Sequence, residues 1–264
     1  MINSIYCEFF KLRKSHFYSS IILITSFMPL TLFLGWELQG HYVVWHEYIF
    51  QIEQLTFLFL TVPLSTLITA YIFSREFSYK TMPSLFCYPI NKAKIFLSKL
   101  IAAAALIAVT IFFQLFLTIL CGFFLNHEQF TSEILFIHLK INLYHILSLY
   151  AILPITIFIT LLCKNMIIPL IYAFVISVSN MFIWSGISAR HLYSMGLFFK
   201  SACNYIPTYH PLLSLTNCIK QSKGNEHIIS TSFPLSSSSI IVDLLVFAVV
   251  LSLCVLYYYK SDVK

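Results

Sequence analysis

Charged residues are scarce in this chain of 264 residues: 10% are Asp, Glu, Lys or Arg, whereas 59% are apolar. Soluble domains average about 25% charged and about 45–50% apolar residues, so the composition excludes an ordinary soluble enzyme. The sequence also lacks a G-x-x-x-x-G-K-[ST] phosphate-binding loop and the hydrolase motifs H-E-x-x-H and G-x-S-x-G. We therefore expect no catalytic residue, metal ligand or cofactor-binding residue in this chain.

Closely spaced cysteines are missing as well, because the seven cysteines include no C-x-x-C motif. This absence argues against a metal framework and favours free thiols buried within helices. Cys203 and Cys218 are a special case, because both fall in one loop expected on the oxidising outer side of a membrane. A disulfide between these two residues and a pair of free thiols are both left open.

Long apolar runs dominate what is present. A helix needs about 20 apolar residues to cross about 30 Å of hydrocarbon. Six runs are long enough: Phe17–Trp36, Leu55–Ser74, Leu100–Leu125, Ile141–Cys163, Met166–Gly186 and Ile240–Tyr259. The sequence predicts an all-α integral membrane protein with six transmembrane helices in a single domain, residues 1–264.

The basic residues predict the orientation of the spans. If the N-terminus is cytoplasmic, most of the 16 Lys and Arg residues fall in cytoplasmic segments, as the positive-inside rule requires. We therefore expect a multi-pass protein of the cell membrane with both termini in the cytoplasm. Spans four and five are separated only by Lys164-Asn165, which predicts a tight antiparallel hairpin.

Residues 1–16 predict an amphipathic helix at the inner membrane surface. Apolar residues recur at helical spacing, and we expect the basic residues to face anionic lipid. A disordered basic tail is the alternative. The charged residues of this predicted interfacial helix are Glu8, Lys11, Arg13 and Lys14.

Two longer segments separate predicted spans. The inner loop Arg75–Lys99 carries five basic residues among many apolar ones, which predicts short helices packed on the membrane domain or on a cytosolic partner. Pro89 is a natural break within it, and a purely topogenic basic loop is the alternative. The outer segment 187–239 holds apolar stretches too short to span, so we expect re-entrant or interfacial helices with a bend between Pro207 and Pro211.

Ionisable residues are nearly absent from the predicted spans, with Asp243 the one acidic residue inside them. This scarcity argues against a proton-coupled carrier. His41, His46, Glu47 and Glu53 show no metal-ligand spacing, so a polar outer face is favoured over a metal site. The outer acidic residues are a by-product of topology or steer a cationic peptide, and the candidates for steering are Glu47, Glu53 and Glu128.

The chain resembles permease subunits of ABC-2 type transporters, most closely those of lantibiotic immunity and bacitracin resistance. The segment Tyr6–Ser15 is similar to the interfacial helix motif E-x-x-K-x-(K/R)-(K/R)-(S/T) of that family, and the stretch with Pro207 and Pro211 is similar to its outer helical insert. Lys80 and Pro83 depart from the loop pattern of the family. The residues that match this pattern after span two are Glu76, Thr81, Leu85, Pro89, Lys92 and Lys99.

The resemblance implies that transport and ATP hydrolysis belong to different subunits. The loop Arg75–Lys99 would form a coupling helix that contacts an ATPase, and two ATPase subunits would bind ATP and Mg. A second permease, identical or a sister chain, would complete the exporter, whose substrate would be an amphipathic peptide or a lipid-linked molecule. Membrane lipid is a further expected partner, and nucleic acid is not. The alternatives are a sensor or assembly subunit without transport, and an intramembrane enzyme, for which no nucleophile–base pair is present.

Overall fold

A computed structural model describes residues 2–13, 15–40, 42–79, 92–188, 201, 205–206, 209 and 237–260. In these ranges the regular elements are helices, and the remaining pairing is one isolated β-bridge between Val43 and His127. The predicted all-α fold is confirmed. Several predicted positions lie outside the described residues, namely Lys14, Lys80, Thr81, Pro83, Leu85, Pro89, Cys203, Pro207, Pro211, Cys218 and most of the outer segment 187–239.

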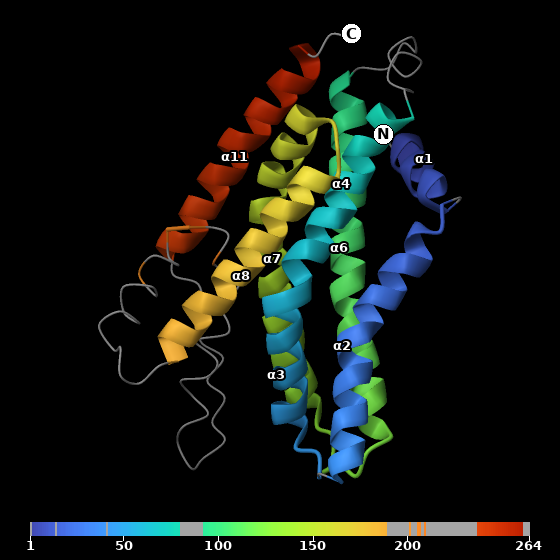
Figure 1. Cartoon of the computed structure of the whole chain (residues 1–264), viewed down its shortest axis with the longest axis vertical. Coiled ribbons are helices and arrows are strands. Elements are labelled where there is room, and N and C mark those ends of the chain that lie inside the picture. The colour runs from blue at the N-terminus through green and yellow to red at the C-terminus, as the bar shows by residue number, and fades with distance from the viewer. Residues whose placement is uncertain are drawn as a thin grey trace.

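The chain runs as a bundle of long helices with a short helix at one end (Figure 1). The short helix is α1, and the C-terminal end of α11 lies at the same end of the bundle as α1. The elements are α1 (Ile2–Arg13), α2 (Phe17–Gln39), α3 (Trp45–Thr56), the π-helical turn η1 (Phe57–Thr61), α4 (Val62–Ser78), α6 (Lys92–Phe123), α7 (Ser132–Cys163), α8 (Ile167–Ser188) and α11 (Ser237–Lys260).

Six helices in the described ranges are long and apolar enough to cross a membrane, which confirms the predicted number. Three boundaries were wrong: the second helix begins at Trp45 rather than Leu55, the third at Lys92 rather than Leu100, and the fourth at Ser132 rather than Ile141. Each extension is polar enough to escape an apolar-run search, yet tertiary packing keeps it helical. The predicted loop Arg75–Lys99 is therefore shorter, because its first residues belong to α4 and its last to α6.

Two left-handed residues end helices and turn the chain. Gly40 caps α2 with φ 63°, and its N–H reaches back to the carbonyls of Glu37 and Trp36. Lys164 caps α7 with φ 52°, and its N–H donates to the Thr160 carbonyl at 2.9 Å. The predicted hairpin at Lys164-Asn165 is confirmed, since α8 starts at Ile167. These caps satisfy carbonyls that would otherwise lack partners at the helix ends.

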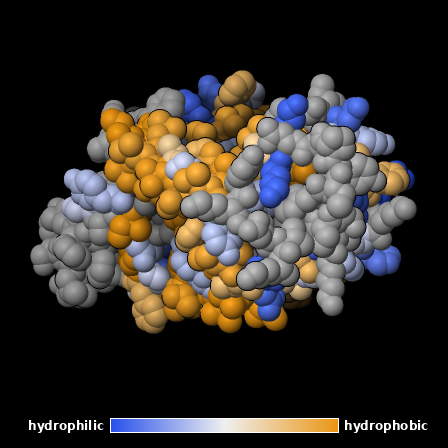
Figure 2. Space-filling model, turned by 90° about the horizontal axis from the view of Figure 1, so that it is seen from above, coloured by the Kyte–Doolittle hydropathy of each residue, from blue (hydrophilic) through white to orange (hydrophobic). Residues whose placement is uncertain are grey.

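Helices α4, α6 and α7 form the centre of the bundle, and α2, α8 and α11 pack on its outside. The main core includes Ile68, Ile107 and Ile157, and a second cluster around Trp45 lies at the end away from α1. Large apolar side chains also cover much of the described outer surface (Figure 2). Helices that are apolar all round suit a lipid environment.

Candidate functional site

An ionic cluster ties α1 to the ends of α4 and α6. It consists of Glu8 and Lys11 from α1, Glu76 from α4 and Lys99 from α6. The Lys99 ammonium lies 2.7 Å from Glu76 Oε1 and 3.3 Å from Glu8 Oε2, and only 2% of this residue is exposed. Lys11 Nζ lies 2.8 Å from Glu8 Oε1 and 3.6 Å from Glu76 Oε1. Two acids and two bases cancel in charge, which offsets the cost of burial.

The charges in this cluster shift the ionisation of both α1 residues. Burial alone would raise the pKa of the Glu8 carboxyl, but the ammonium groups of Lys99 and Lys11 outweigh it and hold the pKa below its ordinary value. Burial alone would lower the pKa of Lys11, but the hydrogen bond to Glu8 and the charges of Glu8 and Glu76 hold it above its ordinary value. Both shifts favour the charged forms, as opposite charges at contact distance do.

The structure therefore joins residues that the sequence assigned to two separate roles. Glu8 and Lys11 were expected in an interfacial helix, and Glu76 and Lys99 in a coupling loop. The expectation that Lys11 faces lipid was wrong, because it turns toward Glu8 and Glu76.

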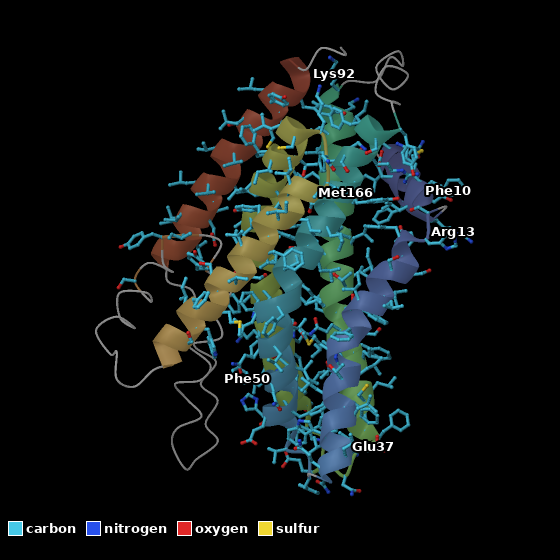
Figure 3. The ribbon with its side chains drawn as sticks, in the orientation of Figure 1. Phe10, Arg13, Glu37, Phe50, Lys92 and Met166 are labelled. Carbon is cyan, nitrogen blue, oxygen red and sulfur yellow. The ribbon has the colours of Figure 1, made fainter. Side chains whose placement is uncertain are left out.

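Residues close in sequence to the members of the cluster are half-buried or exposed. Phe10 and Arg13 point away from the bundle (Figure 3) and are exposed. Arg75 is half-buried, with its guanidinium carbon 5.8 Å from the ring centre of Tyr79. Lys92 is half-buried at the start of α6.

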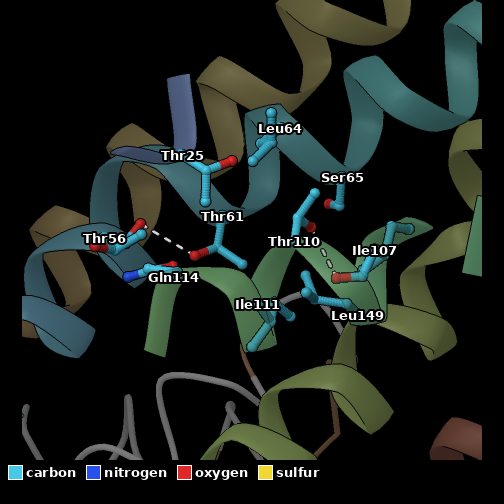
Figure 4. Close-up of a pocket in the computed structure, with 10 residues that line it drawn as sticks. All are labelled: Thr25, Thr56, Thr61, Leu64, Ser65, Ile107, Thr110, Ile111, Gln114 and Leu149. Carbon is cyan, nitrogen blue, oxygen red and sulfur yellow. Dashed lines mark hydrogen bonds between the residues drawn. The ribbon is translucent and has the colours of Figure 1, made fainter. Parts of the chain in front are cut away.

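A small hydroxyl-lined pocket lies in the middle of the bundle, beside the π-helical turn (Figure 4). Its volume is about 10 Å³, which is close to the space that one water molecule requires. Thr61 Oγ1 donates to the Thr56 carbonyl at 3.1 Å across the turn. The pocket is lined by Thr25, Thr56, Thr61, Leu64, Ser65, Ile107, Thr110, Ile111, Gln114 and Leu149.

The hydroxyl groups of this pocket can still accept hydrogen bonds. Thr25, Ser65 and Thr110 donate their protons to carbonyls of their own helices at 2.6, 2.9 and 2.8 Å. Each oxygen keeps a lone pair for a further partner. Thr56 Oγ1 is buried and has no hydrogen-bond partner among the described residues. A buried hydroxyl without a partner is costly and marks a place for a water or a polar ligand group.

An apolar groove of about 180 Å³ adjoins the hydroxyl pocket, and Leu64 lines both. The groove is formed by α2, η1, α4 and α8, with Phe59 and Phe174 partly exposed at its rim. The remaining lining residues are Ile24, Leu60, Pro63, Leu67 and Leu170. An amphipathic molecule could place its chain in the groove and a polar group toward the hydroxyls. The sequence signal for this site is the row of hydroxyl residues Thr56, Thr61 and Ser65 within one apolar run.

A buried imidazole network joins α3 to α7 near the end of the bundle away from α1. His138 Nδ1 lies 2.9 Å from Glu53 Oε2, and Asn142 Nδ2 donates to Glu53 Oε1 at 2.6 Å. His46 Nδ1 lies 3.1 Å from His138 Nε2. The exposed fractions are 6% for Glu53 and 0% for His138, whereas His46 is half-buried. In the described ranges no group of three potential metal ligands occurs.

The predicted outer glutamates are thus in three different settings. The expectation that Glu53 is a solvent-facing steering residue was wrong, because its carboxylate is buried between α3 and α7. Glu128 is half-buried and accepts a hydrogen bond from the Trp45 backbone N–H at 3.1 Å, which caps the start of α3. Glu47 is exposed, as expected.

Two comparisons with known proteins complete this description. The architecture is that of a polytopic α-helical membrane protein, and residues 4–180 match the profile of the ABC-2 family transporter protein. This match covers more than half of the chain, from α1 to α8, and the chain belongs to the ABC-2 family of transporter proteins. It is a transmembrane subunit of that class of transporter.

A curated relative narrows the comparison. The chain is 28% identical over 127 residues to the bacitracin transport permease protein BCRB of Bacillus licheniformis. The aligned region covers 48% of this chain and 61% of the relative, so the two proteins match over less than two thirds of the length of the relative. The predicted resemblance to ABC-2 permeases of the resistance type is confirmed.

Proposed function

We propose that this chain is the permease of an ABC exporter that removes an amphipathic antimicrobial peptide, lantibiotic-like or bacitracin-like, from the membrane. The observation that carries the proposal is the apolar groove, joined through Leu64 to the hydroxyl pocket. The groove has room for an apolar side chain or acyl chain of such a substrate, and the hydroxyl pocket has room for about one water molecule that could bridge to a polar group. The name of the relative, a bacitracin transport permease, supports the same substrate class.

Energy for transport would come from partner chains. Two ATPase subunits bind ATP and Mg, and a second permease completes the assembly. The segment between α4 and α6 contacts an ATPase, with Arg75 and Lys92 near its ends. Glu76 and Lys99 are buried in the ionic cluster, so their part in coupling is indirect: they hold α1, α4 and α6 together so that these elements move as one body.

The orientation that suits this mechanism places α1 and both termini in the cytoplasm. In that orientation the ionic cluster lies at the inner membrane surface and the imidazole network near the outer surface. Tyr6 and Phe10 form an exposed aromatic pair on α1, with ring centres 6.3 Å apart. Aromatic side chains of this kind favour the membrane interface.

The groove can be tested by filling it. Leu64→Trp places a bulky indole ring between the groove and the hydroxyl pocket. Leu23→Trp adds the same ring at a site on α2 that is 73% exposed. Cells that express the permease with its ATPase are challenged with bacitracin, and membrane levels of each variant are measured. We expect Leu64→Trp to lose protection at normal membrane levels and Leu23→Trp to keep it. Equal protection by both variants would contradict a substrate role for the groove.

A further inference from the structure

The imidazole network is a buried acid–base set that transport through the groove does not use. Glu53 lies on α3 and His138 on α7, and among the described residues His138 is the basic side chain paired with this carboxylate. A buried carboxylate without a compensating charge is costly. Two arrangements of the pair avoid this cost because they are neutral as a whole: either Glu53 is ionised and His138 is an imidazolium, or the proton resides on Glu53 and His138 is neutral.

Both neutral arrangements place a proton on the same atom of His138. If Glu53 is ionised, both nitrogens of His138 carry protons. If Glu53 is protonated, it donates to His138 Nδ1, and the ring proton must then be on Nε2. In either case His138 Nε2–H donates to His46 Nδ1, which lies 3.1 Å away and has to accept with its lone pair.

His46 is half-buried, whereas His138 is fully buried. His46 is the second residue of α3, next to the exposed Glu47, so its exposed surface lies at the polar end of the helix, where water is available. When His46 Nδ1 takes up a proton from water, no lone pair is left to accept from His138. Two N–H groups and additional positive charge then face each other, so the hydrogen bond between α3 and α7 is lost. Histidine is the side chain whose ordinary change of charge falls between about pH 5 and 8, so this is the range in which the release is tested.

We propose that His46, His138 and Glu53 form a proton-binding site that fastens α3 to α7, and that protonation of His46 from the adjoining aqueous side releases this contact. The fastened helix α3 continues through η1 into the residues that line the hydroxyl pocket. Release of α3 therefore alters the pocket, and this consequence for transport rests on the proposed function. The proton-binding step itself does not.

The other titratable groups around the network have defined places. His145 lies about two turns beyond His138 on the same face of α7. It is buried and stacked on Phe57, with ring centres 5.3 Å apart. Tyr144 is also buried on α7, and Glu47, Glu133 and Lys140 are exposed. On the side of α3 that meets α2 and α6, the titratable groups are Tyr48 and Cys121, both buried. His127 and Glu128 contact Trp45 beside the start of α3 and are half-buried. Within the network itself, His46 is the histidine that is not fully buried.

Hydrogen exchange measured on the full chain in lipid nanodiscs tests the proposal without ATPase or substrate, so its outcome is independent of the transport assay. Exchange in peptides covering 45–56 and 132–142 is compared at about pH 7.5 and about pH 5.5, after correction for the chemical exchange rate. We expect exchange about tenfold faster at the acid pH, the factor that corresponds to loss of one ordinary hydrogen bond.

Three variants separate the site from general acid effects. His46→Gln keeps a neutral acceptor at every pH, so it should lose the acid response. Glu53→Gln removes the carboxyl group that pairs with His138, so exchange in the same peptides should already be faster at the higher pH. His16→Gln removes an exposed histidine at the α1–α2 junction and should respond as the wild type does. Unchanged protection of the wild type at the two pH values would overturn the proposal even if both network variants fail to fold. A full acid response in His46→Gln would overturn it as well.

Discussion

Replacing Lys99 by Met removes the central cation of the ionic cluster while keeping the length of the side chain. Lys99 is 2% exposed and contacts the carboxylates of Glu8 and Glu76 at 3.3 and 2.7 Å. Removal of one partner from a buried ion pair costs about 3–5 kcal/mol, because the remaining charge stays buried and uncompensated. Lys11 still compensates in part, although its side chain is 39% exposed and its charge is screened by solvent.

We therefore expect the free energy of unfolding to decrease by an amount near the lower end of this range, about 3 kcal/mol. In a chain of this size, each kcal/mol of lost unfolding free energy lowers Tm by about 2–4 °C, so Tm should fall by about 6–12 °C. Thermal unfolding of the purified permease in detergent measures this value. Lys94→Met is the matched control, because Lys94 is exposed on the same helix, and its effect should stay within about 0.5 kcal/mol.

A second substitution distinguishes lost charge from lost packing. The double variant Lys99→Met with Glu76→Gln leaves Glu8 and Lys11 as a balanced pair at 2.8 Å. We expect it to recover much of the Tm lost by Lys99→Met alone. Equal Tm values for Lys99→Met and Lys94→Met, or a double variant less stable than the single one, would refute the cluster as a source of stability.

Acid and strong alkali should both loosen α1. The pKa of Glu8 is lower in the folded than in the unfolded state, so its contribution to stability is present above the unfolded pKa and is lost as pH falls through the folded pKa. The pKa of Lys11 is higher in the folded state, so its contribution to stability is lost as pH rises through the folded pKa. After correction for the chemical exchange rate, protection of peptide 2–13 from hydrogen exchange should be highest near neutral pH, and a flat profile would contradict the pairing. Gly122→Ala should destabilise the protein by about 1–3 kcal/mol, because a Cβ there overlaps the indole of Trp45. Gly35→Ala meets nothing within 4 Å and should stabilise α2 by about 0.5–1 kcal/mol; similar Tm changes for the two variants would show that the Trp45 contact is loose.

The sequence was sufficient for the features that depend on long apolar runs. Six spans, the hairpin at Lys164-Asn165 and the family followed from run length, basic residues and short motifs. The N-terminal extension of the second helix did not, because Glu47, Glu53 and two glutamines interrupt the run. Its helical signal is the buried stripe Trp45, Ile49, Ile52 and Thr56, whose spacing fits one face of a helix.

The polar sites were harder to predict because their members are distant in sequence. Glu8 and Lys99 are 91 positions apart and meet only once α1 folds against α6. The sequence contains one local signal for the network between α3 and α7, because His138, Asn142 and His145 are spaced so that they share one helical face. That spacing could have shown that these side chains lie inside the bundle. Their partner Glu53 could not be identified without the tertiary contact.

The central claim, transport of an amphipathic peptide driven by a partner ATPase, is tested most directly by ATP hydrolysis in a reconstituted complex. The permease is co-purified from native membranes with every associated subunit, placed in lipid nanodiscs, and assayed across a range of bacitracin concentrations. The account predicts saturable stimulation of ATP hydrolysis, which Leu64→Trp abolishes and Leu23→Trp preserves while basal hydrolysis stays unchanged. A rate that does not respond to bacitracin or to a lantibiotic at any concentration, in a complex that contains its ATPase, would contradict it.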